Sequence, residues 1–231
     1  MEDVYVFVDL SNIVYGGRNT AFDREGCLAV GDFRLHVEHI VALARGGRQL
    51  QAGFCVGSSS PNMDPLFSRF EQLGFSVRVT ERGRSTGTEQ GVDEILQLEM
   101  MNSMLDAAKP GVAVLMTGDG SGFETGRGFL AALQRMAYKG WGIEVLSWEG
   151  ACNRHLRTWA EDVGVYVPLD DYYASVTFME GGRRPRALSL KRRRIDRPVN
   201  AAGCLLEHSC EHWRSGVSMV RQKPLVTFPC G

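Results

Sequence analysis

Three aspartates stand at the edges of predicted secondary-structure elements, where their carboxylates can meet. Asp9 directly follows the apolar run 4–8, and Asp119 follows the apolar run 112–116 and a short turn. Asp93 lies in the first turn of a long predicted helix. Open α/β sheets bind ligands in the crevice outside the carboxyl ends of their strands. If the two strands are neighbours where the strand order reverses, Asp9 and Asp119 share that crevice and Asp93 can reach it from its helix.

Three carboxylates in one crevice imply a bound cation. Like charges repel and raise each other's pKa values, so the arrangement costs free energy unless a cation is present. Oxygen ligands without histidine favour hard divalent ions, which predicts Mg²⁺ or Mn²⁺ held by Asp9, Asp93 and Asp119. Asn12 follows Asp9 by three residues, and its amide can hydrogen-bond that carboxylate or a ligand.

Each of these residues also has a purely structural interpretation. Asp9 and Asn12 are residue types common in turns. Asp93 can complement the dipole of its helix, which is worth about 0.3–1 kcal/mol, and Asp119 can cap a turn. The shared residue type and the shared position at the ends of elements favour a metal site.

The elements that must position these residues alternate between strands and helices. Apolar runs predict strands over residues 4–8, 51–56, 75–80, 112–116, 143–148 and 165–167. Helical patterns cover residues 33–44, with Asp32 as the cap, and residues 64–73, 92–108, 126–138 and 153–163. Residues 20–31 are polar and contain glycine, which predicts a loop. The alternation predicts a three-layer α/β fold with a mainly parallel sheet.

Charge divides the chain into an acidic body and a basic tail. Residues 1–180 contain 15 Lys and Arg against 24 Asp and Glu, whereas residues 181–231 contain 11 against 3. We therefore expect one domain over 1–180 and a flexible tail over 181–231. The tail residues expected to bind nucleic-acid phosphates are Arg183, Arg184, Lys191, Arg192, Arg193 and Arg194. A targeting signal and a merely solvated tail are the alternatives.

Composition excludes several classes of protein. The 231 residues are 44% hydrophobic, enough for a full core, but no run of eighteen apolar residues predicts a membrane helix. The chain begins Met1-Glu2-Asp3, without the basic region typical of a secretion signal. The six cysteines are widely spaced, so we expect reduced thiols and a cytoplasmic location.

Several motifs together resemble a known family. They are Val8-Asp9-Leu10-Ser11-Asn12 after the first strand, Gly91-Val92-Asp93 at a helix start, Thr117-Gly118-Asp119 after an apolar strand, and Gly140 before Ile143-Glu144-Val145. Their order resembles the NYN domain, a branch of the PIN-like metal-dependent ribonucleases. The resemblance covers roughly residues 3–173.

The resemblance implies a Rossmann-like sheet of order 3-2-1-4-5 and an acidic cluster that binds Mg²⁺ or Mn²⁺. It also implies hydrolysis of phosphodiester bonds in RNA, which we expect to be single-stranded. Asp9, Asn12, Asp93 and Asp119 match the family's catalytic positions, and Ser11 would help to orient the nucleic acid. Many NYN domains have a further aspartate two residues after the Gly-Asp pair.

This chain has Ser121 there, and Glu124 is the expected replacement as a metal ligand. The substitution leaves a second function open: a catalytically weak module that binds RNA or a partner. A small-molecule or nucleotide-binding α/β domain rests on fold analogy alone. The glycines near Asp119 do not have the G-x-G-x-x-G spacing of dinucleotide sites. Homo-oligomerisation stays open.

Overall fold

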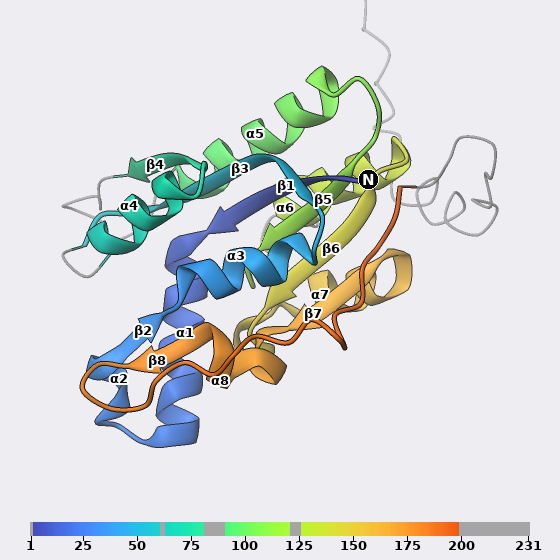
Figure 1. Ribbon diagram of the computed structural model, residues 1–231. Helices are drawn as coiled ribbons and strands as arrows, with labels where there is room; N and C mark the ends of the chain where they lie inside the picture. Colours follow the sequence, from blue (N-terminus) through green and yellow to red (C-terminus); the bar gives the residue numbers. More distant parts are fainter. Residues whose placement is uncertain (1, 61–62, 81–90, 121–125, 199–231) are drawn as a thin grey trace, which may run out of the picture. The chain divides into compact units, whose positions relative to one another are not determined.

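A parallel sheet forms the centre of the computed structural model, which describes residues 2–60, 63–80, 91–120 and 126–198. The six strands have the order β4-β3-β1-β5-β6-β7, and every neighbouring pair is parallel (Figure 1). Their bounds are β1 Asp3–Asp9, β3 Gln49–Ser58, β4 Ser76–Thr80, β5 Val112–Met116, β6 Gly142–Ser147 and β7 Val165–Pro168. The predicted order of the first five strands agrees with this sheet, and β7 extends it beyond β6.

Strand β1 is buried on both faces, as its apolar sequence predicts. Val6 and Val8 belong to one hydrophobic cluster, and Phe7 between them belongs to the other. Successive strand residues point to opposite faces of a sheet, so β1 separates two cores. A central parallel strand requires apolar side chains on both faces.

Helices cover both faces of the sheet and complete three layers (Figure 1). Buried residues of α1 (Leu10–Glu25), α3 (Val37–Arg45) and α4 (Asp64–Gln72) belong to the cluster that contains Val6. Buried residues of α5 (Val92–Asp106), α6 (Gly128–Tyr138) and α7 (Arg154–Val163) belong to the cluster that contains Phe7. The short elements are α2 Ala29–Asp32, η2 Glu149–Ala151, η3 Leu169–Tyr172 and α8 Tyr173–Val176.

The structure differs from the sequence prediction between β1 and α3. Helix α1 begins directly after β1 and continues through the predicted loop as far as Glu25. The predicted helix that starts after Asp32 begins only at Val37, because Phe33–Leu35 form strand β2 and pair antiparallel with β8 (Thr177–Met179). That partner lies far away in the sequence, so no local pattern could reveal the strand.

The compact unit that contains the sheet extends to Pro198, beyond the boundary expected at residue 180. Glu144 in β6 is fully buried and forms salt bridges with Arg48 and Arg193. The backbone N–H of Asp196 donates to the same carboxylate, at 2.7 Å. The first part of the predicted flexible tail is therefore packed in the body. A buried carboxylate needs such partners because desolvation of its charge is costly.

No helix in the described ranges is long and apolar enough to span a membrane.

Candidate active site

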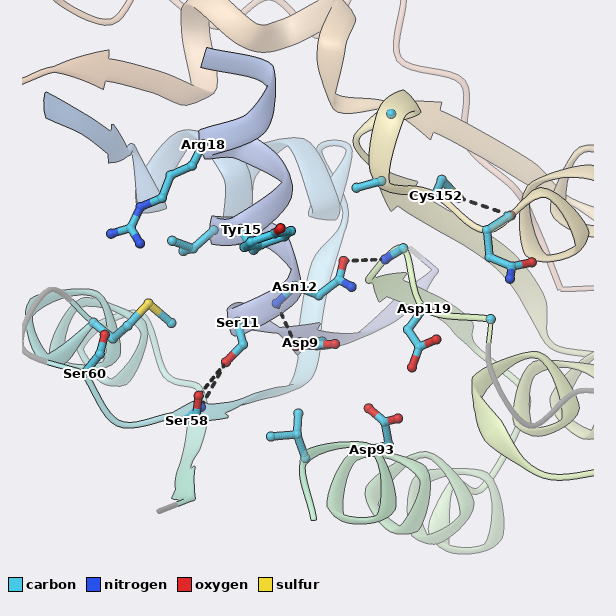
Figure 2. Close-up of a pocket in the computed structure, with 18 residues that line it drawn as sticks. Asp9, Ser11, Asn12, Tyr15, Arg18, Ser58, Ser60, Asp93, Asp119 and Cys152 are labelled. Carbon is cyan, nitrogen blue, oxygen red and sulfur yellow. Dashed lines mark hydrogen bonds between the residues drawn. The ribbon is translucent and has the colours of Figure 1, made fainter. Parts of the chain in front are cut away.

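The three predicted aspartates line one cavity of about 650 Å³ (Figure 2). Asp9 ends β1, and Asp119 follows β5 after a short turn. Asp93 is the second residue of α5. Strands β1 and β5 are paired, with Val8 opposite Met116, and so their carboxyl ends meet at this edge of the sheet. The structure thus brings Asp9 together with two side chains that lie more than eighty residues away in the sequence.

Hydrogen bonds hold Asp9 at the centre of this site. Its carboxylate accepts from the backbone N–H of Asn12 at 3.0 Å and from Oγ1 of Thr117 at 3.0 Å. Thr117 Oγ1 in turn accepts from the backbone N–H of Asp119 at 3.1 Å. Asp9 is only 5% exposed. Because Asp9 also caps α1, one carboxylate fixes both the start of that helix and the end of β5.

The side chain of Asn12 ties the same two strand ends together. Its Oδ1 accepts from the backbone N–H of Gly118 at 2.7 Å (Figure 2). A Cβ atom on Gly118 would lie 2.2 Å from the backbone oxygen of Ala151. The turn after β5 therefore needs a glycine for close packing against η2. This requirement explains Gly118 without a phosphate-binding glycine loop.

Burial and negative neighbours raise the pKa of Asp93 to about 7. Burial has the largest effect, followed by the charge of Asp119 and its hydrogen bond to Asp93, and then by the charges of Asp9 and Glu94. The expected repulsion between carboxylates is therefore present. Below about pH 7 the Asp93 carboxyl therefore holds a proton, in a form that can hydrogen-bond to Asp119.

The chemistry of these oxygen donors fits a hard divalent ion, but their spacing is not that of a complete metal site. Among the residues that the structure describes, no three His, Cys, Asp or Glu side chains are grouped closely enough to hold a metal ion. Glu124, the expected additional ligand, and Ser121 lie outside the described residues. Carboxylates are the ligand type that Mg²⁺ and Mn²⁺ select, and a cation would replace the proton on Asp93.

Ser11 is also part of the cavity wall. Its Oγ accepts from the backbone N–H of Ser58 at 3.0 Å and lies 3.3 Å from Oγ of the same residue. This contact holds the first turn of α1 against the end of β3. The hydroxyl borders the cavity (Figure 2), and its contact with nucleic acid stays a prediction.

The basic residues predicted to bind nucleic acid lie in different environments. The side chain of Arg193 is 1% exposed and is engaged with Glu144, so it is not available to bind phosphates. Arg183 forms a salt bridge with Glu25 at 2.9 Å and lies over the ring of Tyr173. Four others are exposed: Arg184, Lys191, Arg192 and Arg194. Nucleic-acid binding by these four stays a prediction.

Sequence reasoning missed two residues of the site, Tyr15 and Arg18, and gave no role to Thr117, which it named only within a motif. Thr117 holds Asp9, and Tyr15 and Arg18 line the cavity from α1. Asn12, Tyr15 and Arg18 recur every three residues, which is the spacing of one helix face. The pattern becomes visible only when the helix is known to begin directly after Asp9.

Comparison with known proteins gives a family and a fold. No curated protein matches the chain. A crystal structure of a protein of unknown function, VPA0982 from Vibrio parahaemolyticus RIMD 2210633, is similar with a TM-score of 0.53 and 16% identity, over 74% of this chain and 94% of the other. That similarity concerns the fold. The model of the NYN domain matches residues 3–162, and NYN domains are generally nucleases. This match covers more than half of the sequence, and the chain therefore belongs to the NYN domain family.

Proposed function

We propose that the protein is a metal-dependent ribonuclease that hydrolyses phosphodiester bonds of single-stranded RNA. The observation that carries this proposal is the position of Asp9, Asp93 and Asp119 around one cavity. Membership of the NYN family supports the same activity. Besides burial, the negative charges of Asp119, Asp9 and Glu94 raise the pKa of Asp93. The cavity thus concentrates negative charge, which is the requirement for binding a cation.

Asp9, Asp93 and Asp119 would hold Mg²⁺ or Mn²⁺, with Glu124 as a further candidate ligand. In such sites a divalent ion activates water and neutralises the charge that develops on the phosphate and the leaving oxygen. Because water is then the nucleophile, we expect products with 5′-phosphates.

The chain's own residues position the reacting groups. Thr117 and the backbone N–H of Asn12 fix the orientation of the Asp9 carboxylate. The side chain of Asn12 keeps the turn that carries Asp119 against α1. Asp93 must lose its proton before it can bind a cation, so activity should rise as the pH rises through about 7.

Cleavage of a 5′-labelled single-stranded RNA by the full chain tests the proposal. We expect cleavage in Mg²⁺ or Mn²⁺ and none in excess EDTA. Asp119→Asn should lower the rate by at least about 10- to 100-fold, the loss typical of disturbing a metal site. Asp106→Asn is the matched control, because Asp106 is exposed at the other end of α5. Equal cleavage in EDTA would contradict the proposal.

The second candidate is a catalytically weak module that binds RNA or a partner. It is favoured by the incomplete grouping of metal ligands within the described ranges and by Ser121 at a position where many family members have aspartate. Gel-shift binding without turnover, in both Mg²⁺ and Mn²⁺, would select this candidate.

A further inference from the structure

The cavity continues beyond the aspartates along one face of α1. Asn12, Tyr15 and Arg18 all border it (Figure 2). With a rise of 1.5 Å per residue, Arg18 lies about 9 Å from Asn12 along the helix axis. The face therefore leads from the acidic cluster to a cationic side chain, with an aromatic side chain between them.

The side chain of Arg18 has a hydrogen-bond donor for which the described part of the chain supplies no acceptor. Its Nε is buried and has no hydrogen-bond partner there. Arg24, farther along the same helix, instead pairs with Asp170. A buried donor without an acceptor costs free energy, so the position of Arg18 favours an acceptor from a ligand. Guanidinium groups match phosphate oxygens in geometry and charge.

Tyr15 has an equally unusual environment for its residue type. Its side chain is 68% exposed, although it borders a cavity and lies one helical turn from Arg18. Exposed aromatic rings beside a cation are what single-stranded nucleic acids use, because a base stacks on the ring while the cation binds the backbone.

We propose that Tyr15 and Arg18 form a nucleotide subsite next to the acidic cluster. Arg18 binds a backbone phosphate of single-stranded RNA, and Tyr15 stacks the base that lies between this phosphate and the one at the aspartates. The orientation of the RNA in this subsite, with one phosphate at the aspartates, rests on the proposed ribonuclease function. A base in a duplex is already stacked and paired, so the subsite selects single-stranded RNA over a duplex of the same sequence.

The phosphate contact is tested by the salt dependence of binding. Fluorescence anisotropy of a labelled ten-nucleotide oligouridine is measured in EDTA, where metal-dependent cleavage is absent. Arg18→Gln should weaken binding and lower the slope of log K against log salt by about 0.7, the value for one phosphate contact on a single strand. Arg18→Lys should largely restore the slope. Lys139→Gln removes an exposed charge at the end of α6 and should leave the slope unchanged.

The stacking contact is tested with Tyr15→Ala. This variant should weaken binding by about 5- to 150-fold, the range for the loss of one stacked base, and should leave the salt slope unchanged. Tyr15→Phe should bind as the unsubstituted protein does. Tyr138→Ala is the matched control, because Tyr138 is 74% exposed at the end of α6. An oligonucleotide with an abasic site at the stacked position should remove the difference between Tyr15→Ala and the unsubstituted protein.

Each outcome tests either the proposed nucleotide subsite or the proposed ribonuclease activity. Binding of Arg18→Gln and Tyr15→Ala that equals binding of the unsubstituted protein, at unchanged melting temperatures, would overturn the subsite even if the protein cleaves RNA. Binding of the duplex as tight as that of the single strand, or no RNA binding by the full chain, would also overturn it. Weakened binding by both variants without any cleavage in Mg²⁺ or Mn²⁺ would support the subsite and refute the ribonuclease.

Discussion

Acidic side chains lie at two places, within strand β6 and beside the carboxyl ends of β1 and β5, and their charges have different neighbours. Glu144 is fully buried in β6 and has two guanidinium partners, Arg48 at 2.8 Å and Arg193. Beside the carboxyl ends of the strands, Asp9 accepts from the backbone N–H of Asn12 and from the hydroxyl of Thr117. Burial and, after it, negative neighbours raise the pKa of Asp93 to about 7. The charge of Glu144 is balanced by two guanidinium groups, whereas Asp9 and Asp93 lie with other carboxylates in one cavity. Both Glu144 and Asp9 are buried, so the two places differ in the charges of the neighbouring groups and not in burial.

Loss of Glu144 should have the largest effect on stability. Glu144→Ala leaves the buried charges of Arg48 and Arg193 without their carboxylate partner, and removal of one partner of a buried ion pair costs about 3–5 kcal/mol. Urea unfolding followed by circular dichroism measures this loss. Glu161→Ala is the control, because Glu161 pairs with Arg157 on the surface, where such a pair is worth about 0.3–0.5 kcal/mol. Losses of equal size would remove the contrast between the two acidic groups.

Thr117→Val tests how far the aspartate site depends on neutral donors. Thr117 is fully buried, and its hydroxyl donates to Asp9 and accepts from the backbone N–H of Asp119. Valine keeps the shape but removes the hydroxyl, so we expect a loss of about 1.5–3 kcal/mol in the free energy of unfolding. Thr80→Val, which removes a weaker contact to the backbone oxygen of Gly57, should cost less. A stability change near zero would mean that Thr117 does not hold Asp9.

The sequence predicts the centre of the fold better than its periphery. Strands β1 and β5 are recognisable because both of their faces are buried, so their apolar runs are continuous. Helix α1 is not recognisable, because its buried face includes Gly16 and Gly17. A Cβ on Gly16 would lie 2.7 Å from Cδ1 of Trp148, so close packing replaces the apolar side chains that mark a helix.

The residues of the candidate site also differ in how well the sequence predicts them. Asp9 and Asp119 are predictable because they directly follow recognisable strands. Tyr15 and Arg18 are not, because their spacing has meaning only on a helix whose start was not predicted. The prediction that Arg193 binds phosphates was wrong for a different reason. A basic run normally indicates a solvated segment, but Arg193 pairs with the buried carboxylate of Glu144, which no local sequence pattern connects with it.

Asp93→Asn should change stability in the opposite direction to Glu144→Ala, and by less. In the metal-free protein the pKa of Asp93 is raised from 3.8 to about 7, so the folded state binds the proton more tightly than the unfolded state. Stability should therefore fall as the pH rises from about 4 to about 7 and then level off.

Removal of the Asp93 charge abolishes this fall. In EDTA the variant should therefore be more stable than the unsubstituted protein at pH 8 and nearly equal to it at pH 4. Melting temperatures across this range measure the difference, with Asp106→Asn as the control on the same helix. Added Mn²⁺ should raise the melting temperature of the unsubstituted protein more at pH 8 than at pH 6, because the ion competes with the proton on Asp93. Mn²⁺ should raise the melting temperature of the variant less at both pH values. A variant destabilised at pH 8 in EDTA would show that Asp93, like Glu144, already has its partners within the folded chain.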